Sequence, residues 1–216
     1  MSLLVLQGAV EQGFIYALVA LGLYISFRTL DIADLTTDGT FTLGAAVSAV
    51  FTVQGQPLLG VVLAFFCGAL AGFVTALLQT KLGVQPILAG IITMTALYSV
   101  NLMVMGKPNI NFFKEKTIFT AAEAMPGGFG SLLQAAAITA VLCVLLVLFL
   151  RTQLGLSLRA TGDNRDMVSA SSINPAFTTT VGLCLSNAVV ALSGALIAQY
   201  QKFADNTLGT GMVVIG

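Results

Sequence analysis

The most polar stretch of the sequence covers residues 151–175, and its residue types are suited to contact with another protein rather than to covalent chemistry. Asp163 or Asn164 can accept backbone N–H hydrogen bonds and so begin a short helix, which must end before the proline that closes the stretch. Within that helix Met167 and Ala170 lie on one face, because residues three apart share a side of a helix. A capped helix with a small apolar face favours docking on a soluble partner.

The same stretch carries regularly spaced glycines and arginines. Gly155 and Gly162 are expected at turns, where a larger side chain would clash, and Arg159 can hold the loop to its base or to a partner by charge-assisted hydrogen bonds. The alternative is a solvated connector whose arginines only anchor it among lipid headgroups. Both interpretations place these residues outside the apolar part of a membrane.

A second polar stretch, residues 34–40, opens an otherwise apolar segment. A single Asp in the middle of a bilayer costs about 2.5 to 3.5 kcal/mol, so this stretch should face protein or water rather than lipid. One interpretation is a polar lining of a translocation path. The alternative is a helix start whose Asp38 and threonines bond nearby backbone groups, together with polar residues that bond a neighbouring helix. The residues that could line the path are Thr36, Thr37, Asp38, Thr40, Thr42, Thr93, Asn101 and Asn187.

The composition shows which elements must position these residues. Of 216 residues, 57% are hydrophobic and 8% are charged, whereas soluble domains carry about 25% charged residues. The mean hydropathy is +0.97. Because so few charges cannot cover a soluble surface, most of the chain must lie in lipid. Nine basic and nine acidic residues give no net charge and no basic run, which argues against nucleic acid as a partner.

Six apolar windows reach the length of about 20 residues that a membrane-spanning helix needs. They are approximately Leu3 to Phe27, Leu35 to Val53, Leu58 to Leu78, Ile87 to Met105, Leu132 to Leu150 and Phe177 to Ala198. The polar start of the second window and Pro86 before the fourth indicate broken or re-entrant helix starts. A seventh run begins at Met212 and is cut off at Gly216, so we expect the sequence to be a fragment.

Small residues four apart, such as Gly68 with Gly72 and Gly194 with Ala198, allow helix backbones to approach closely. Ordinary packing within the bundle explains them. The Gly68 and Gly72 face is also suited to contact with a second copy of the chain.

The distribution of basic residues predicts the orientation. If the windows alternate in direction, Lys81 and all four arginines fall on one side, which should be cytoplasmic. The arginines are Arg28, Arg151, Arg159 and Arg165. Four lysines fall on the other side and weaken the bias: Lys107, Lys114, Lys116 and Lys202. We therefore expect an external N-terminus.

The sequence lacks the residues that several kinds of chemistry need. The sequence has no His, which excludes Ser–His and Cys–His nucleophile pairs, and its three cysteines lie in separate apolar runs without metal-ligand spacing. We expect no enzyme activity, no metal and no cofactor. An ion-coupled secondary transporter or a channel is the main alternative class. An ion-coupled transporter would use carboxylates near the middle of the membrane, whereas Glu11 and Asp38 lie nearer the ends of their windows.

The polar loop also carries a family resemblance. The pattern R-x-x-x-G-x-x-x-R-A-x-G-x-N, formed by Arg151, Gly155, Arg159, Ala160, Gly162 and Asn164, resembles the cytoplasmic coupling segment of ABC permeases in the branched-chain amino acid and ribose importer superfamily. Residues 16–22, 43–45 and 192–196 are similar to other spans of that family. Residues 34–39 depart from its Asn-Phe-Ala-x-Gly stretch and resemble the largely uncharacterised tryptophan/tyrosine-type branch.

The resemblance implies an all-α polytopic transmembrane helix bundle with a cytoplasmic coupling helix, in which residues 1–216 form a single permease domain truncated at its C-terminal end. It implies a bacterial inner-membrane importer subunit for a small solute, such as an aromatic or other amino acid. The chain has no G-x-x-x-x-G-K-[ST] phosphate loop, so a separate ATPase subunit would supply energy. An extracytoplasmic substrate-binding protein and a second permease copy, identical or closely related, would complete the transporter. The docking residues would be Gly155, Arg159, Ala160, Gly162, Asn164, Met167 and Ala170.

Overall fold

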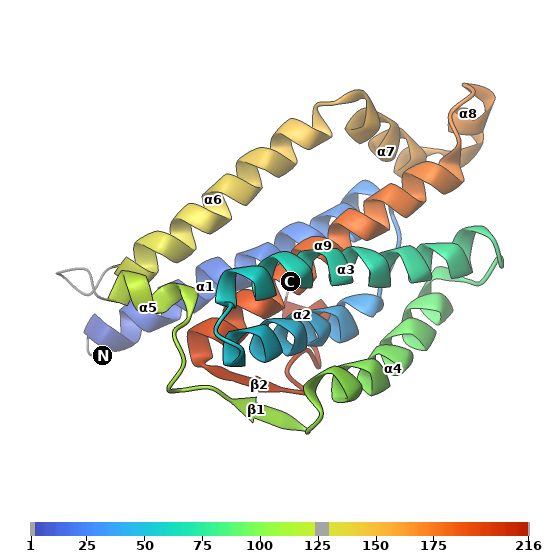
Figure 1. Ribbon diagram of the computed structural model, residues 1–216. Helices are drawn as coiled ribbons and strands as arrows, with labels where there is room; N and C mark the ends of the chain where they lie inside the picture. The colour runs from blue at the N-terminus through green and yellow to red at the C-terminus, as the bar shows by residue number, and fades with distance from the viewer. Residues whose placement is uncertain (1–2, 124–129, 216) are drawn as a thin grey trace.

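Long apolar helices determine the architecture, because a chain in lipid must satisfy its backbone hydrogen bonds within its own helices. The computed structural model describes residues 3–123 and 130–215. In these residues five helices are long and apolar enough to cross a membrane. They cover Val5–Thr29, Pro57–Thr80, Pro86–Met105, Gly130–Leu150 and Pro175–Gln201. The prediction of an all-α polytopic bundle is confirmed (Figure 1).

The elements follow one another along the chain as α1 (Leu3–Leu23), the π-helical turn η1 (Tyr24–Thr29), α2 (Thr36–Val53), α3 (Pro57–Thr80), α4 (Pro86–Met105), β1 (Asn109–Asn111), α5 (Ile118–Glu123), α6 (Gly130–Leu150), α7 (Gln153–Asp163), α8 (Arg165–Ala170), α9 (Pro175–Gln201), β2 (Phe203–Asp205) and α10 (Met212–Ile215). Strands β1 and β2 pair antiparallel with Ile110 opposite Ala204. Figure 1 places α7 and α8 at one end of the bundle and α5 at the other. Which end faces the cytoplasm stays a prediction.

Helix α9 is the centre of the bundle. It packs mainly against α3, α2 and α1, and 78% of its most apolar window is buried. Asn174 caps its first turn by accepting hydrogen bonds from the backbone N–H groups of Ala176 and Phe177, and Pro175 occupies the first helical position, where no N–H is needed. Helix α6 is the opposite case, with 11% of its window buried.

Helix α2 differs from the other predicted spans. It has the predicted extent, but it is not among the helices that are long and apolar enough to cross a membrane. Most of its residues, threonines included, are buried against α9, α3 and α4. A helix enclosed by other helices does not meet lipid, so it can carry polar residues that a lipid-facing helix cannot.

Glycines allow this close packing. A Cβ atom at Gly44 would overlap the carbonyl oxygen of Ala191, and one at Gly194 would overlap the carbonyl oxygen of Phe41, so α2 and α9 cross backbone to backbone. Gly68 and Gly72 make similar contacts between α3 and α9. The face that Gly68 and Gly72 form is therefore occupied within the chain, and the suggestion that it contacts a second copy is wrong.

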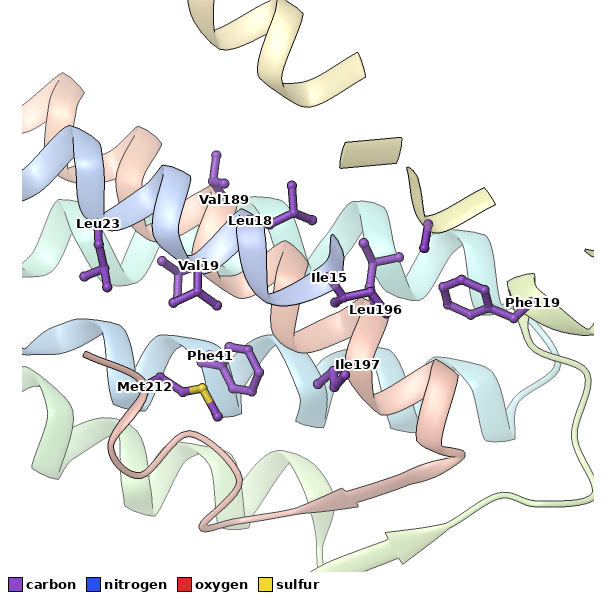
Figure 2. Close-up of a cluster of buried hydrophobic side chains, with 12 residues drawn as sticks. Ile15, Leu18, Val19, Leu23, Phe41, Phe119, Val189, Leu196, Ile197 and Met212 are labelled. Carbon is purple, nitrogen blue, oxygen red and sulfur yellow. The ribbon is translucent and has the colours of Figure 1, made fainter. Parts of the chain in front are cut away.

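Figure 2 shows the main apolar core, where side chains of α1, α2 and α9 meet. Leu18 and Val19 of α1 and Ile197 of α9 are fully buried beside Phe41 of α2. Met212, the first residue of α10, reaches the same core. The run predicted to begin at Met212 thus forms helix α10, which packs onto α2.

The crossing of α2 and α9 can be tested by adding a single methyl group. Gly194→Ala should lower the free energy of unfolding by about 1 to 3 kcal/mol, because overpacking forces the backbones apart. Gly13→Ala is the matched control, since a Cβ at Gly13 would meet nothing within 4 Å. Unfolding of the detergent-solubilised protein, followed by far-UV circular dichroism, measures both variants. Equal effects of the two substitutions would disprove the close contact.

Candidate functional site

Helix α2 begins inside the protein, and Asp34 provides its first hydrogen bond. The Oδ1 atom of Asp34 accepts a hydrogen bond from the backbone N–H of Thr36 at 2.9 Å. The Asp34 side chain is 0% exposed. A carboxylate at this position satisfies a backbone N–H that has no partner within the helix, and its charge suits the helix N-terminus. The predicted site set omitted Asp34.

The second oxygen of Asp34 continues into a buried polar network. Its Oδ2 atom accepts a hydrogen bond from Nδ2 of Asn187 on α9 at 2.7 Å. Asn187 Oδ1 accepts in turn from the hydroxyl of Thr40 at 2.8 Å. The hydroxyls of Thr36 and Thr75 on α3 lie 2.9 Å apart. The network therefore joins three helices at the start of α2.

Seven of the eight residues predicted to line a path are buried, and five of these seven lie outside the groove described below, each with a hydrogen-bond partner. These five are Thr36, Thr37, Thr40, Thr93 and Asn187. Their hydroxyl and amide groups bond neighbouring backbone or side-chain atoms, as the helix-start alternative expects. A role of these five residues in translocation stays a prediction.

The other three predicted residues, Asp38, Thr42 and Asn101, meet in one groove. It is a cavity of about 260 Å³ between α2, α4 and the segment that follows β2. Asn101 donates to the carbonyl oxygen of Gly39 at 3.2 Å, while its Oδ1 atom is buried without a hydrogen-bond partner. The remaining lining residues are Gly39, Met94, Thr95, Tyr98, Asn206 and Thr210.

Asp38 and Thr42 also fix the far wall of this groove. The two carboxylate oxygens of Asp38 accept hydrogen bonds from the backbone N–H groups of Gly211 at 2.8 Å and Val213 at 3.0 Å. The hydroxyl of Thr42 accepts from the N–H of Gly209 at 3.0 Å. Asp38 therefore holds the start of α10 against α2. No sequence pattern linked these distant residues.

At the end of the bundle opposite α5, the polar loop folds into two helices, where the sequence predicted one (Figure 1). The missed helix is α7, whose first turn is capped by the hydroxyl of Thr152, which accepts from the N–H of Gly155 at 3.3 Å. Asn164 caps α8 by accepting from the N–H of Met167 at 3.0 Å, which confirms the predicted cap. The pattern Thr152-x-x-Gly155 could have revealed α7, because Thr is a favoured N-cap.

Gly155 and Gly162 lie inside α7 rather than at turns, which corrects that expectation. A Cβ at Gly155 would overlap the backbone of α6 at Phe149 and Leu150, and a Cβ at Gly162 would overlap the carbonyl oxygen of Thr29 in η1. The two glycines therefore allow α7 to lie directly on its neighbours.

The predicted docking face of α8 is exposed. The Met167 side chain is 68% exposed and Ala170 is also exposed, while Val168 is buried and anchors the helix. In α7, Arg159 is exposed and Ala160 is half-buried. Within residues 3–123 and 130–215, no three His, Cys, Asp or Glu side chains are grouped so that they could hold a metal ion.

Comparison with known proteins gives matches over nearly the whole chain. Residues 5–216 match the family described as the branched-chain amino acid transport system permease component. A tyrosine transport system permease protein of Clostridioides difficile is 38% identical over 206 residues, which cover 95% of this chain and 68% of that protein. An uncharacterized protein of Rickettsia prowazekii is 34% identical over 212 residues, covering 98% and 74% of the two chains.

A more distant relative is the galactofuranose transporter permease protein of Escherichia coli. It is 29% identical over 194 residues, which cover 88% of this chain and 54% of that protein. No solved structure matches the chain.

The buried network at the start of α2 can be tested by removing the side-chain amide of Asn187. Asn187→Leu should lower the free energy of unfolding by about 3 kcal/mol, because Asp34 Oδ2 and Thr40 lose their partner away from water. Thr93→Val should cost about 1 kcal/mol or less, since Thr93 bonds only Ala89 of its own helix. Adding Asp34→Asn to Asn187→Leu should recover part of the loss by removing the buried charge. Equal losses for Asn187→Leu and Thr93→Val would contradict this network.

Proposed function

The chain belongs to the family of branched-chain amino acid transport permease components, and we propose that it is the membrane-spanning subunit of an importer driven by a separate ATP-binding-cassette ATPase. It is a transport permease and a multi-pass protein of the bacterial inner membrane. In the proposed complex, an extracytoplasmic binding protein delivers the solute. A second permease copy, identical or closely related, supplies the other half of the path.

The exposed apolar side of α8 is the observation that carries the proposal. Met167 and Ala170 lie on a capped helix at one end of the bundle, where a soluble ATPase subunit could reach them. Most apolar side chains of this protein face lipid or the core, whereas α8 belongs to the polar loop. An apolar side chain presented to water on a short rigid helix is suited to a groove in a partner.

A push on α8 has a physical route into the membrane. Helix α7 connects α8 with α6, and the hydroxyls of Thr161 in α7 and Thr178 in α9 lie 2.8 Å apart. Gly162 packs on η1 at the end of α1. These contacts join the proposed docking helix to α1 and α9 as one body. Movement of an ATPase could therefore shift the central helix of the permease, which is the connection that coupling needs.

We place the solute in the groove between α2 and α4. Its wall combines the apolar side chains of Met94 and Tyr98 with the polar groups of Asp38, Thr42 and Asn101. Mixed linings of this kind suit small molecules that have both polar and apolar parts, such as amino acids. The tyrosine permease named among the relatives supports an aromatic amino acid as the first cargo to test.

An ion-coupled transporter would instead use its buried carboxylates. Glu11 accepts hydrogen bonds from Gln7, Ser131 and Tyr200, and Asp34 accepts from Thr36 and Asn187. Carboxylates held by several donors are suited to structural roles. This arrangement favours the ATP-driven proposal. Solute uptake into vesicles in the absence of ATP would instead support an ion-coupled transporter.

The docking role of α8 predicts a defect in coupling rather than in assembly. Met167→Asp combined with Ala170→Asp should reduce substrate-stimulated ATP hydrolysis and uptake by about tenfold or more, because the docking face becomes charged. The measurement is the ATPase rate of the complete transporter in vesicles, with and without loaded binding protein.

Ser169→Asp combined with Ser172→Asp is the matched control, since both serines are exposed on other faces of the same loop. Asp tolerates the left-handed backbone at Ser172, where φ is 63°. If the Met167 and Ala170 variant assembles and couples like this control, α8 has no docking role.

The groove predicts a defect in solute affinity. Asn101→Leu removes the buried Oδ1 atom that has no partner within the protein, and it should raise the KM for uptake about tenfold through loss of one hydrogen bond. Thr95→Val is the control, because the Thr95 hydroxyl bonds its own helix at Ile91 and Ile92. Uptake of radiolabelled tyrosine and leucine into vesicles compares the two variants. The same KM in both would remove this groove from the transport path.

A further inference from the structure

Two arginines lie beside an apolar cavity that the transport proposal does not use. The cavity has a volume of about 410 Å³ and lies where α1 and η1, the last turns of α6 and helix α7 meet. Arginines next to aliphatic side chains suit a ligand that is anionic at one end and apolar at the other. The main lining residues are Leu21, Tyr24, Leu146, Val147, Arg151 and Arg159.

The apolar part of this cavity continues deeper into the protein. A second cavity of about 230 Å³ shares Leu21 and Leu146 with the first. It extends between α6 and α9 towards Phe65 and Val189, and its remaining lining is aliphatic or aromatic. The two cavities together form an apolar groove that leads from the arginines along α6 towards the membrane interior.

The groove exists because α6 makes hydrogen bonds to α1 in its first half, whereas its second half is held by apolar side chains such as Leu146 and Leu150, which pack beside Leu158 of α7. In its first half, Ser131 donates to Glu11 at 2.7 Å and Thr139 donates to the carbonyl oxygen of Phe14 at 2.8 Å. Its second half diverges from α1 and α9 in Figure 1, and both cavities lie there. The low buried share of α6, 11% of its most apolar window, agrees with this separation.

We propose that this groove binds one anionic phospholipid, with its phosphate between Arg151 and Arg159 and an acyl chain along the second half of α6. Guanidinium groups bind phosphate through paired charge-assisted hydrogen bonds. Both arginines follow the end of a spanning helix, at the depth where lipid headgroups lie, and Tyr24 is a residue type enriched at that depth. Basic pockets between membrane helices recognise anionic headgroups in this way.

A soluble anion would use the arginines but not the groove. A phosphate ion or a nucleotide would leave the aliphatic wall of Leu146, Val147 and Leu21 exposed to water, whereas an acyl chain covers it. A phospholipid therefore accounts for both halves of the site. Because the bound lipid would contact α1, α6 and α7 together, it would also add contacts between these three helices.

The test is lipid binding to the complete purified protein, measured by native mass spectrometry during titration with phosphatidylglycerol or with phosphatidylcholine of the same acyl chains. Wild-type protein should bind one phosphatidylglycerol more tightly than phosphatidylcholine. Arg151→Gln combined with Arg159→Gln should weaken phosphatidylglycerol binding about thirtyfold, which is about fivefold for each arginine. Arg28→Gln combined with Arg165→Gln removes the same charge from exposed sites that do not line the cavity and should have little effect.

A second variant tests the apolar half and does not depend on the arginines. Val147 lines the cavity and is 43% exposed, so Val147→Trp places a large side chain in the groove. It should weaken binding of both lipids about tenfold, because the tryptophan occupies the space of the acyl chain. Millimolar inorganic phosphate should not displace phosphatidylglycerol. Displacement by phosphate, or unchanged lipid binding in both the arginine and the Val147→Trp variants, would overturn the proposal.

Discussion

The start of α2 depends on one carboxylate placed where there is no water. The first N–H groups of a helix have no partner in the helix itself, and inside a membrane protein each unpaired group is costly. Asp34 accepts the hydrogen bond of the Thr36 N–H, and Asn187 of the central helix donates a hydrogen bond to the other oxygen of Asp34. Because both oxygens of the carboxylate are used, α2 can begin inside the bundle. The rest of the polar interior is built from this position.

The direction of the polar side chains on α2 follows from helix geometry. Residues two apart on an α-helix point about 200° apart, whereas residues four apart share a side. Thr36 and Thr40 therefore face Thr75 of α3 and Asn187 of α9, where their hydrogen bonds are closed. Asp38 and Thr42 face the opposite way, towards α4 and the segment before α10. One helix thus separates a sealed structural network from an open groove.

This geometry explains how far the sequence could predict the protein. The helices that face lipid were found to within a few residues, because contact with lipid requires long apolar runs. The polar stretch of residues 34–40 was predicted to face protein or water rather than lipid, but the sequence could not assign Asp34 to Asn187, since the pair is separated by 153 residues. For the same reason the sequence did not show that Gly68 and Gly72 pack on α9. The glycines of α7 were assigned to turns because a glycine is required both at a turn and where a helix packs directly on another backbone. The sequence alone does not distinguish these two cases.

The same packing shows which parts of the bundle must move together. Helices α1, α7 and α9 are joined at one end by the Gly162 contact with Thr29 and by the Thr161 and Thr178 hydroxyls. A displacement of α8 would therefore act on the helix that carries Asn187, and through Asn187 on the start of α2 and the groove beside it. Apolar cavities lie between α1, α9 and the second half of α6, but the last turn of α6 lies directly against Gly155 of α7. Coupling through the loop would thus act on the polar centre through α9 and on the end of α6 through α7.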